Sequence, residues 1–135
     1  MVVVQCVGWD KNKCNYIQGG KQLRSELVQL LGQPLSIWIT TLFHNVCKQI
    51  GKSEMSLDNV VVQIMRHDNP KFGLAFKQPF SKTGKGVGNG CPDMKVGYSG
   101  DLVEFQKTLI HEAIHLLNYD EEMTEMKTQE LYETF

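Results

Sequence analysis

Three residues of the chain, His111, Glu112 and His115, form the pattern H-E-x-x-H in the apolar run between Thr108 and Asn118. Successive residues of a helix are rotated by about 100°, so the two histidines lie about 40° apart and one turn from each other. Two imidazoles at this spacing can bind one metal ion from a single rigid element, as zinc ligands often do. Glu112 lies at the rim of the same face, where its carboxylate can reach a metal-bound water without binding the metal. The pattern therefore predicts a metal site with a general base beside it.

The apolar residues of the segment lie on one side of the expected helix, away from the two histidines. Histidines that only pack in a hydrophobic core are expected on the apolar side of a helix. His111 and His115 lie on the opposite side, so we interpret them as ligands, with an ordinary pair of surface histidines as the alternative. The apolar side consists of Leu102, Leu109, Ala113, Leu116 and Leu117.

The sequence T-L-I-H-E-A-I-H-L-L, which starts at Thr108, resembles the active-site helix of the zincin metallopeptidases. The resemblance implies that His111 and His115 bind zinc and that Glu112 is the general base. The acidic segment 120–132 resembles the second helix of the small glutamate-zincins, which include phage-type and ImmA/IrrE-like peptidases. These proteins take their third zinc ligand from a glutamate early in that helix. The resemblance covers residues 94–135.

The source of the third ligand is open, because a catalytic zinc site usually has three protein ligands. His44 and His67 are remote in sequence, and we expect them on a partly exposed helix and in a turn. Glu125 is the first choice, since it lies one turn into the last helix and matches the glutamate of the small glutamate-zincins. Glu122 and Glu121 are the alternatives, and Glu121 has the spacing of the last ligand in H-x-x-x-H-x-x-x-x-x-H. Most acidic runs are solvated helix faces, which is the competing interpretation for each glutamate.

The leading functional hypothesis is a zinc-dependent metallopeptidase that hydrolyses a peptide or protein substrate. Zinc on His111, His115 and Glu125 would lower the pKa of its bound water and polarise the peptide carbonyl. Glu112 would take the proton of the attacking water and pass it to the leaving amine. An additional oxyanion stabiliser has three candidates, which are Tyr98, Tyr119 and Tyr132.

Two other functions remain open. The pattern H-x-x-x-H-L-L-x-Y-D is also similar to the YbeY family of metal proteins linked to ribosomal RNA processing, which implies a metal-dependent RNA nuclease. That family has glycine after its first histidine and a histidine as third ligand. This chain has Glu112 and Glu121 at these positions, and both differences count against that function. The second alternative is a zincin-like domain that binds zinc for stability and interaction without turnover.

The remaining sequence predicts an α+β fold, a zincin-like minimal domain over residues 1–135. In it, N-terminal helices pack on a small, mostly antiparallel sheet, followed by the motif helix and a C-terminal helix. Expected strands cover 2–7, 59–66, 72–76 and 94–98, and expected helices cover 21–31, 35–50, 101–118 and 120–132. Asp101 and Glu104 form a capping box at the start of the motif helix. By the zincin resemblance, an edge strand, for which we consider 94–98, pairs with an extended substrate.

Two helices have predicted buried sides. Apolar residues recur at helical spacing along 35–50 and along the last helix. We expect both sets to pack inward. They are Ile37, Trp38, Leu42, Val46 and Ile50 in the first, and Met123, Met126 and Leu131 in the second.

Length and composition fit a single globular domain. The chain has 135 residues, 41% hydrophobic and 21% charged, with a net charge of −1 that gives no general attraction to nucleic acid or membranes. No apolar run approaches the roughly 18 residues that a membrane span needs. The N-terminal sequence lacks the features of a signal peptide. We therefore expect a cytoplasmic protein whose four scattered cysteines keep free thiols.

Overall fold

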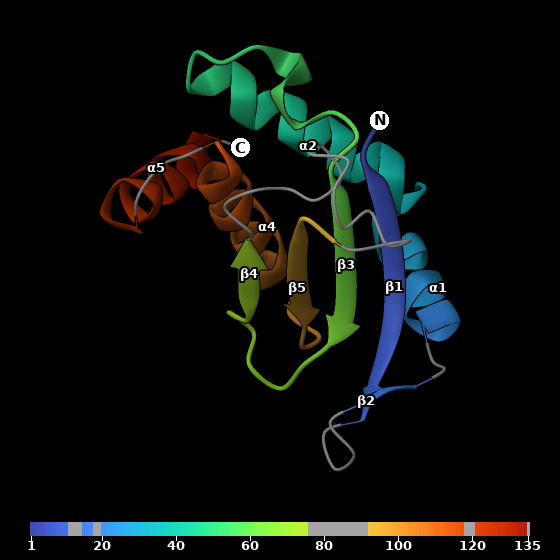
Figure 1. The fold of residues 1–135 in the computed structure, drawn as a ribbon. Helices are drawn as coiled ribbons and strands as arrows, with labels where there is room; N and C mark the ends of the chain where they lie inside the picture. The colour runs from blue at the N-terminus through green and yellow to red at the C-terminus, as the bar shows by residue number, and fades with distance from the viewer. Residues whose placement is uncertain (11–14, 18–19, 76–91, 118–120, 135) are drawn as a thin grey trace.

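The structure is a computed structural model that describes residues 1–10, 15–17, 20–75, 92–117 and 121–134. Its strands are β1 (Val3–Asp10), β2 (Asn15–Ile17), β3 (Val61–Arg66), β4 (Gly73–Ala75) and β5 (Met94–Tyr98). Its helices are α1 (Gly20–Leu31), α2 (Leu35–Gln49), the 3-10 helix η1 (Glu54–Leu57), α4 (Leu102–Leu116) and α5 (Glu121–Thr134) (Figure 1). The expected α+β class is confirmed. No helix in the described part of the chain is both long and apolar enough to cross a membrane.

The five strands form one sheet in the order β2-β1-β3-β5-β4. The three central strands β1, β3 and β5 are parallel, whereas β2 and β4 pair antiparallel at the two edges. The sheet is therefore mixed rather than mostly antiparallel as predicted. The reason is the connection between β1 and β3, because α1 and α2 carry the chain back to the end of the sheet where β1 began.

The position of β5 also differs from the expectation. Residues 94–98 do not form an edge strand, since β5 lies between β3 and β4. The edge on this side of the sheet is the three-residue strand β4, which pairs only with β5 among the described strands. A substrate that adds a strand next to the motif helix would therefore pair with β4.

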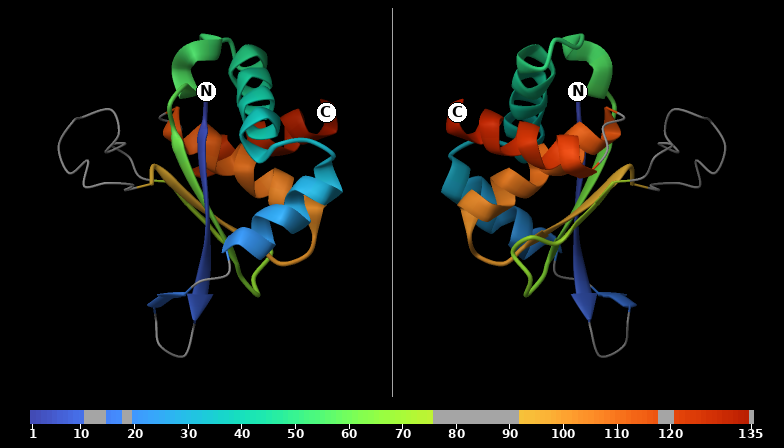
Figure 2. Two further views of the ribbon diagram at one scale, coloured as in Figure 1. Left: turned by 90° about the vertical axis from the view of Figure 1, so that its right-hand side faces the viewer. Right: turned by 90° about the vertical axis from the view of Figure 1, so that its left-hand side faces the viewer.

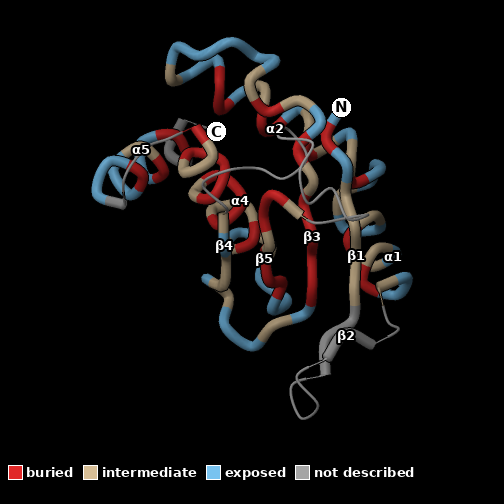
Figure 3. Tube along the Cα trace, in the orientation of Figure 1, coloured by how far each residue is buried: buried red, intermediate tan, exposed pale blue. Residues whose placement is uncertain are grey.

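All the α-helices in the described part of the chain lie on one side of the sheet, which Figure 2 shows edge-on. The hydrophobic core fills the space between these two layers, and Figure 3 shows buried residues along β3, β5 and α4. Alternate residues of the strands point into it, as the two-residue period of a strand requires. The contributing strand side chains are Val62, Ile64, Met94 and Val96.

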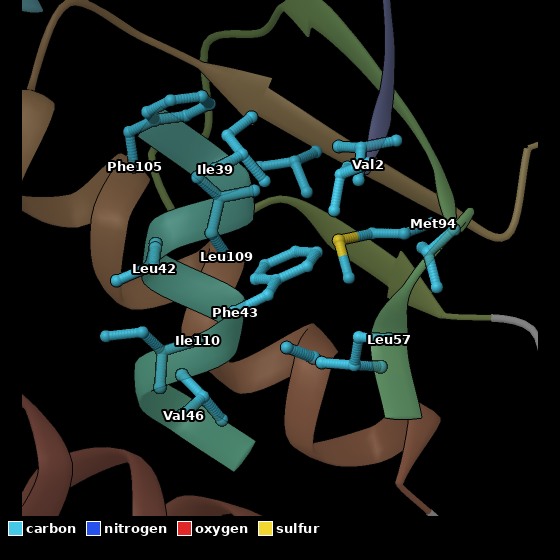
Figure 4. Close-up of a cluster of buried hydrophobic side chains, with 14 of the residues drawn as sticks. Val2, Ile39, Leu42, Phe43, Val46, Leu57, Met94, Phe105, Leu109 and Ile110 are labelled. Atoms are coloured by element: carbon cyan, nitrogen blue, oxygen red, sulfur yellow. The ribbon is translucent and has the colours of Figure 1, made fainter. Parts of the chain in front are cut away.

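Helix α2 packs in the core through a side that only partly matches the predicted one, since Leu42 and Val46 are buried as expected. Ile37 is 45% exposed and Trp38 is only partly buried, although Trp38 stacks on Phe105 with ring centroids 6.2 Å apart. Phe43 is fully buried and points from α2 toward Met94 (Figure 4). The buried side is therefore turned from the predicted one toward Phe43, which faces Met94 across the core. The buried residues of α2 are Leu35, Ile39, Leu42, Phe43, Val46 and Cys47.

The start of α4 is fixed as the sequence predicts. The Oδ1 atom of Asp101 accepts hydrogen bonds from the backbone N–H groups of Val103 (3.0 Å) and Glu104 (3.2 Å). The cap satisfies donors of the first turn that have no partner within the helix. Gly100 precedes it with φ of +107°, a backbone conformation that glycine adopts readily. Helix α4 therefore begins directly at the end of β5, and its register relative to the sheet is set.

A pair of alanine substitutions in α2 tests this packing. We expect Phe43→Ala to lower the free energy of unfolding by about 3–5 kcal/mol, because it removes a ring from the core and leaves a cavity. Ile37→Ala should change the free energy of unfolding by only about 0.5 kcal/mol, as exposed substitutions do. Urea unfolding of both variants is the measurement. A larger loss in Ile37→Ala would contradict the orientation of α2.

Candidate metal centre

The two motif histidines converge on a common point. The Nε2 atoms of His111 and His115 are 3.2 Å apart, and their rings meet at 74° with centroids 4.8 Å apart. A tetrahedral zinc ion with Zn–N bonds of about 2.0–2.1 Å holds two ligand nitrogens about 3.3–3.4 Å apart. Both side chains are partly buried and come from one helix, which limits their movement. The donor atoms and their spacing thus fit two of the ligands of a zinc ion.

Glu112 lies beside this pair and is only 6% exposed. Its side chain packs against the edge strand β4 at Gly73. A Cβ atom added to Gly73 would lie 2.9 Å from both Cγ and Oε1 of Glu112, and 2.7 Å from Cγ2 of Thr108. The absence of a side chain at position 73 therefore allows the Glu112 carboxylate to lie directly on the backbone of β4.

A cavity of about 490 Å³ opens in front of the motif. Segment 71–73, α4 and α5 form its walls, and His111, Glu112 and Glu125 all line it. Apart from Gly73, the described residues of its lining all have polar or charged side chains. The cavity thus places the predicted base, one predicted histidine ligand and the predicted third ligand around one polar volume.

Neither Glu125 nor Glu122 lies close enough to His111 and His115 to complete a metal site. Within the described residues, no group of three His, Cys, Asp or Glu side chains is close enough to hold a metal ion. Glu125 is exposed at the cavity wall, and Glu122 is exposed outside the cavity lining. Glu121 belongs to α5, but its side chain lies outside the described part of the chain. The assignment of Glu125 therefore stays a prediction.

The two other histidines have structural contacts away from the cavity. His44 Nε2 lies 3.2 Å from Oδ1 of Asp58, which links α2 to the residue after η1. His67 stacks on Phe72 with ring centroids 4.1 Å apart, and its Nδ1 accepts a hydrogen bond from the backbone N–H of Asn69. His67 thus belongs to a turn, as the sequence predicts, and neither histidine lines the cavity.

The tyrosine candidates for oxyanion stabilisation gain no support. Tyr98 is buried in the core against Phe105, with ring centroids 5.4 Å apart, and it does not line the cavity. Burial raises the pKa of the Tyr98 hydroxyl. The side chains of Tyr119 and Tyr132 lie outside the described residues.

Helix α5 contacts α4 through threonines that the sequence analysis missed. Met123 and Met126, which we expected to pack inward, are 41% and 63% exposed, whereas Leu131 is buried as expected. The buried positions 124, 128 and 131 recur at helical spacing, and Thr124 and Thr128 occupy the first two. The Oγ1 atom of Thr124 lies 3.4 Å from Nδ1 of His115. The helical spacing of positions 124, 128 and 131 could have revealed the buried side of α5. The prediction chose Met123 and Met126 because methionine is more hydrophobic than threonine.

A double-mutant cycle tests the contact between β4 and α4. We expect Gly73→Ala to lower the free energy of unfolding by about 1–3 kcal/mol, because the added methyl group overpacks the contact with Thr108 and Glu112. Thr108→Ser removes the Cγ2 methyl group that would clash, so the cost of Gly73→Ala should be smaller in that background. Urea unfolding of the single and double variants measures the coupling, with Leu74→Ala on the exposed side of β4 as control. Equal costs in both backgrounds would contradict the contact.

Comparisons with protein-family models, with curated proteins and with solved structures find no match for this chain. They give no support to the zincin or YbeY resemblance and no argument against either. Conclusions about function therefore rest on the geometry of the motif helix and of the cavity in front of it.

Proposed function

We propose that the protein is a zinc-dependent metallopeptidase in which His111 and His115 bind the metal and Glu112 is the general base. One observation carries the proposal. The two Nε2 atoms lie 3.2 Å apart, close to the separation of two zinc ligands, while the adjacent Glu112 is buried and lines the same cavity as His111. Two metal donors and a protected carboxylate on one helix are among the groups that metal-dependent hydrolysis of a peptide bond uses.

The chain's own residues have separate tasks in this reaction. A bound zinc ion would supply Lewis acidity, which lowers the pKa of water and polarises a carbonyl group. Glu112 accepts the proton of the attacking water and returns it to the amine that leaves. The backbone of β4 at Gly73 holds the Glu112 side chain on one side, which fixes where the carboxylate can lie.

The edge strand β4 supports a peptide as substrate. It is the last strand on its side of the described sheet, and it packs against α4 beside Glu112. An extended peptide can bind such an edge as an additional strand through backbone hydrogen bonds. A peptide bound there would lie beside Glu112 and the cavity. The proposed binding mode would therefore bring the substrate to the proposed general base.

The proposal includes Glu125 as the third ligand, because it lines the cavity with His111. We expect Glu125→Gln to weaken zinc binding by more than the roughly 10–100-fold that loss of an outer hydrogen-bond partner costs. Glu122→Gln, an exposed change outside the cavity lining, should keep the wild-type affinity. Competition with a chromogenic chelator measures all variants, together with Glu121→Gln. A loss confined to Glu121→Gln would reject Glu125 and assign the ligand to position 121.

The central test combines metal content with activity. Wild type and Glu112→Gln should each bind close to one zinc per chain, whereas His115→Ala should lose it and become less stable to heat. Wild type should cleave peptides from a mixed library, and Glu112→Gln should be slower by about 10²-fold or more, because it lacks the base. A wild-type protein without zinc, whose melting is unaffected by chelator, would refute the proposal.

A metal-dependent RNA nuclease is the second candidate, and one observation favours it. Lys71 and Lys107 line the cavity, and cationic side chains at this place suit the anionic oxygens of a phosphodiester. The same preparations separate the two functions when RNA is added to the assay. RNA cleavage that Glu112→Gln abolishes, with binding that weakens steeply with salt, would replace the peptidase proposal. Zinc-dependent stability with neither activity would indicate a binding domain.

We also propose that the protein acts in the cytoplasm. Cys6 is not in a disulfide, and a reducing compartment keeps such a thiol reduced. Burial raises the pKa of the Cys6 thiol, which lowers its reactivity.

A further inference from the structure

His115 has a neighbour at each of its two ring nitrogens. Its Nε2 atom is 3.2 Å from Nε2 of His111, and its Nδ1 atom is 3.4 Å from Oγ1 of Thr124 on α5. Thr124 is completely buried, so bulk water does not compete directly at its hydroxyl group. The imidazole of His115 thus lies between the predicted metal position and a side chain of the next helix.

These contacts have a consequence for the tautomer of His115. A neutral imidazole carries one hydrogen, on either Nδ1 or Nε2, and only the nitrogen without hydrogen can bind a metal. When Nδ1 carries the hydrogen, it can donate to Thr124 Oγ1, and Nε2 presents its lone pair. In the metal-free protein, His111 Nε2–H can then donate to His115 Nε2, so one arrangement of hydrogens satisfies both contacts.

The packing of α5 fixes where the Thr124 hydroxyl lies. Thr124, Thr128 and Leu131 form the buried side of α5, and α5 packs on α4. The hydroxyl group of Thr128 has its own partner within α5, since its Oγ1 atom donates a 2.7 Å hydrogen bond to the backbone carbonyl of Thr124. A buried hydroxyl group costs free energy unless it is hydrogen-bonded, and Oγ1 of Thr124 has the Nδ1 atom of His115 within hydrogen-bonding distance. Contact with His115 gives the hydroxyl at this position a physical purpose.

We propose that Thr124 is a positioning residue of the metal centre. Its hydroxyl accepts a hydrogen bond from Nδ1–H of His115, and this holds the ring in the orientation and tautomer that direct Nε2 to the metal. The inference rests on the metal site of the proposed function and adds a partner from α5 to it. Metal-binding histidines generally donate their second N–H in this way, and loss of the partner weakens metal binding by roughly 10–100-fold.

The test uses four variants of the full chain. Thr124→Val keeps the shape of the side chain and removes the hydroxyl, Thr124→Ser restores a hydroxyl, and Thr128→Val removes the neighbouring buried hydroxyl as a matched control. Zinc affinity is measured by competition with a chelator. The tautomer of His115 is measured in the metal-free protein by long-range ¹⁵N–¹H correlation of the imidazole. Thr124→Ala provides a second hydroxyl-free variant in case the branched valine impairs folding.

We expect Thr124→Val to bind zinc about tenfold more weakly and to lose the preference for hydrogen on Nδ1 of His115. Thr124→Ser should recover both properties, and Thr128→Val should keep both near wild type even if it is less stable. Wild-type zinc affinity together with an unchanged tautomer in Thr124→Val would overturn the inference. An equal loss in Thr128→Val would overturn it as well, since general helix packing would then explain the effect.

The two readouts separate this inference from the proposed function. A wild-type protein that binds no zinc overturns the metal site and the positioning role together, even where the tautomer of His115 responds to Thr124→Val. A wild-type protein that binds zinc with an affinity independent of Thr124 leaves the metallopeptidase proposal standing and overturns only the role of the hydroxyl group.

Discussion

The arrangement of the molecule depends on the way α4 is held between the sheet and α5. The helix buries Phe105, Leu109 and Ala113 in the core, and this burial is the main source of its stability. With that side fixed on the sheet, His111 and His115 lie only partly buried on the remaining surface. The Asp101 cap sets the first turn of the helix, so rotation and register are both determined. Any chemistry of the H-E-x-x-H motif depends on this hydrophobic anchor.

Strand β4 and helix α5 contact the polar side of α4 through residues with small side chains. Strand β4 approaches Glu112 closely because Gly73 has no side chain. Helix α5 approaches His115 through the short side chain of Thr124. Small residues at both contacts bring backbone and hydroxyl groups within reach of the motif, where larger side chains would separate the elements. The cavity in front of the motif remains polar, because lysine, glutamate, threonine and glutamine side chains, rather than aliphatic ones, supply most of its lining.

The mixed sheet determines which strand reaches the motif. Parallel pairing of β1, β3 and β5 places β5 in the interior, so the antiparallel strand β4 becomes the edge next to α4. An interior strand has its backbone groups paired on both sides, whereas an edge strand can still accept a partner. The only described strand beside Glu112 that can extend the sheet is therefore the short β4. The strand order therefore determines which strand the proposed extended peptide would pair with.

The sequence alone determined the features that depend on local spacing. The i, i+4 positions of His111 and His115, the cap at Asp101 and the approximate limits of the described α-helices and of every described strand except β2 follow from helix and strand periodicity and from side-chain bonds to nearby backbone. The α+β class followed from the order of these elements. Each of these features requires contacts only between residues close together in the chain.

The tertiary structure decided the features that depend on distant partners. Contacts with distant residues set the rotation of α2, in which Phe43 is fully buried toward Met94 and Ile37 is 45% exposed. On α5, Thr124 and Thr128 occupy the buried side although Met123 and Met126 are more hydrophobic. The parallel pairing of the central strands and the contact between Gly73 and Glu112 join segments far apart in sequence. A helical or strand pattern specifies which residues share a side, but the shape and chemistry of the surface opposite it decide which side is buried.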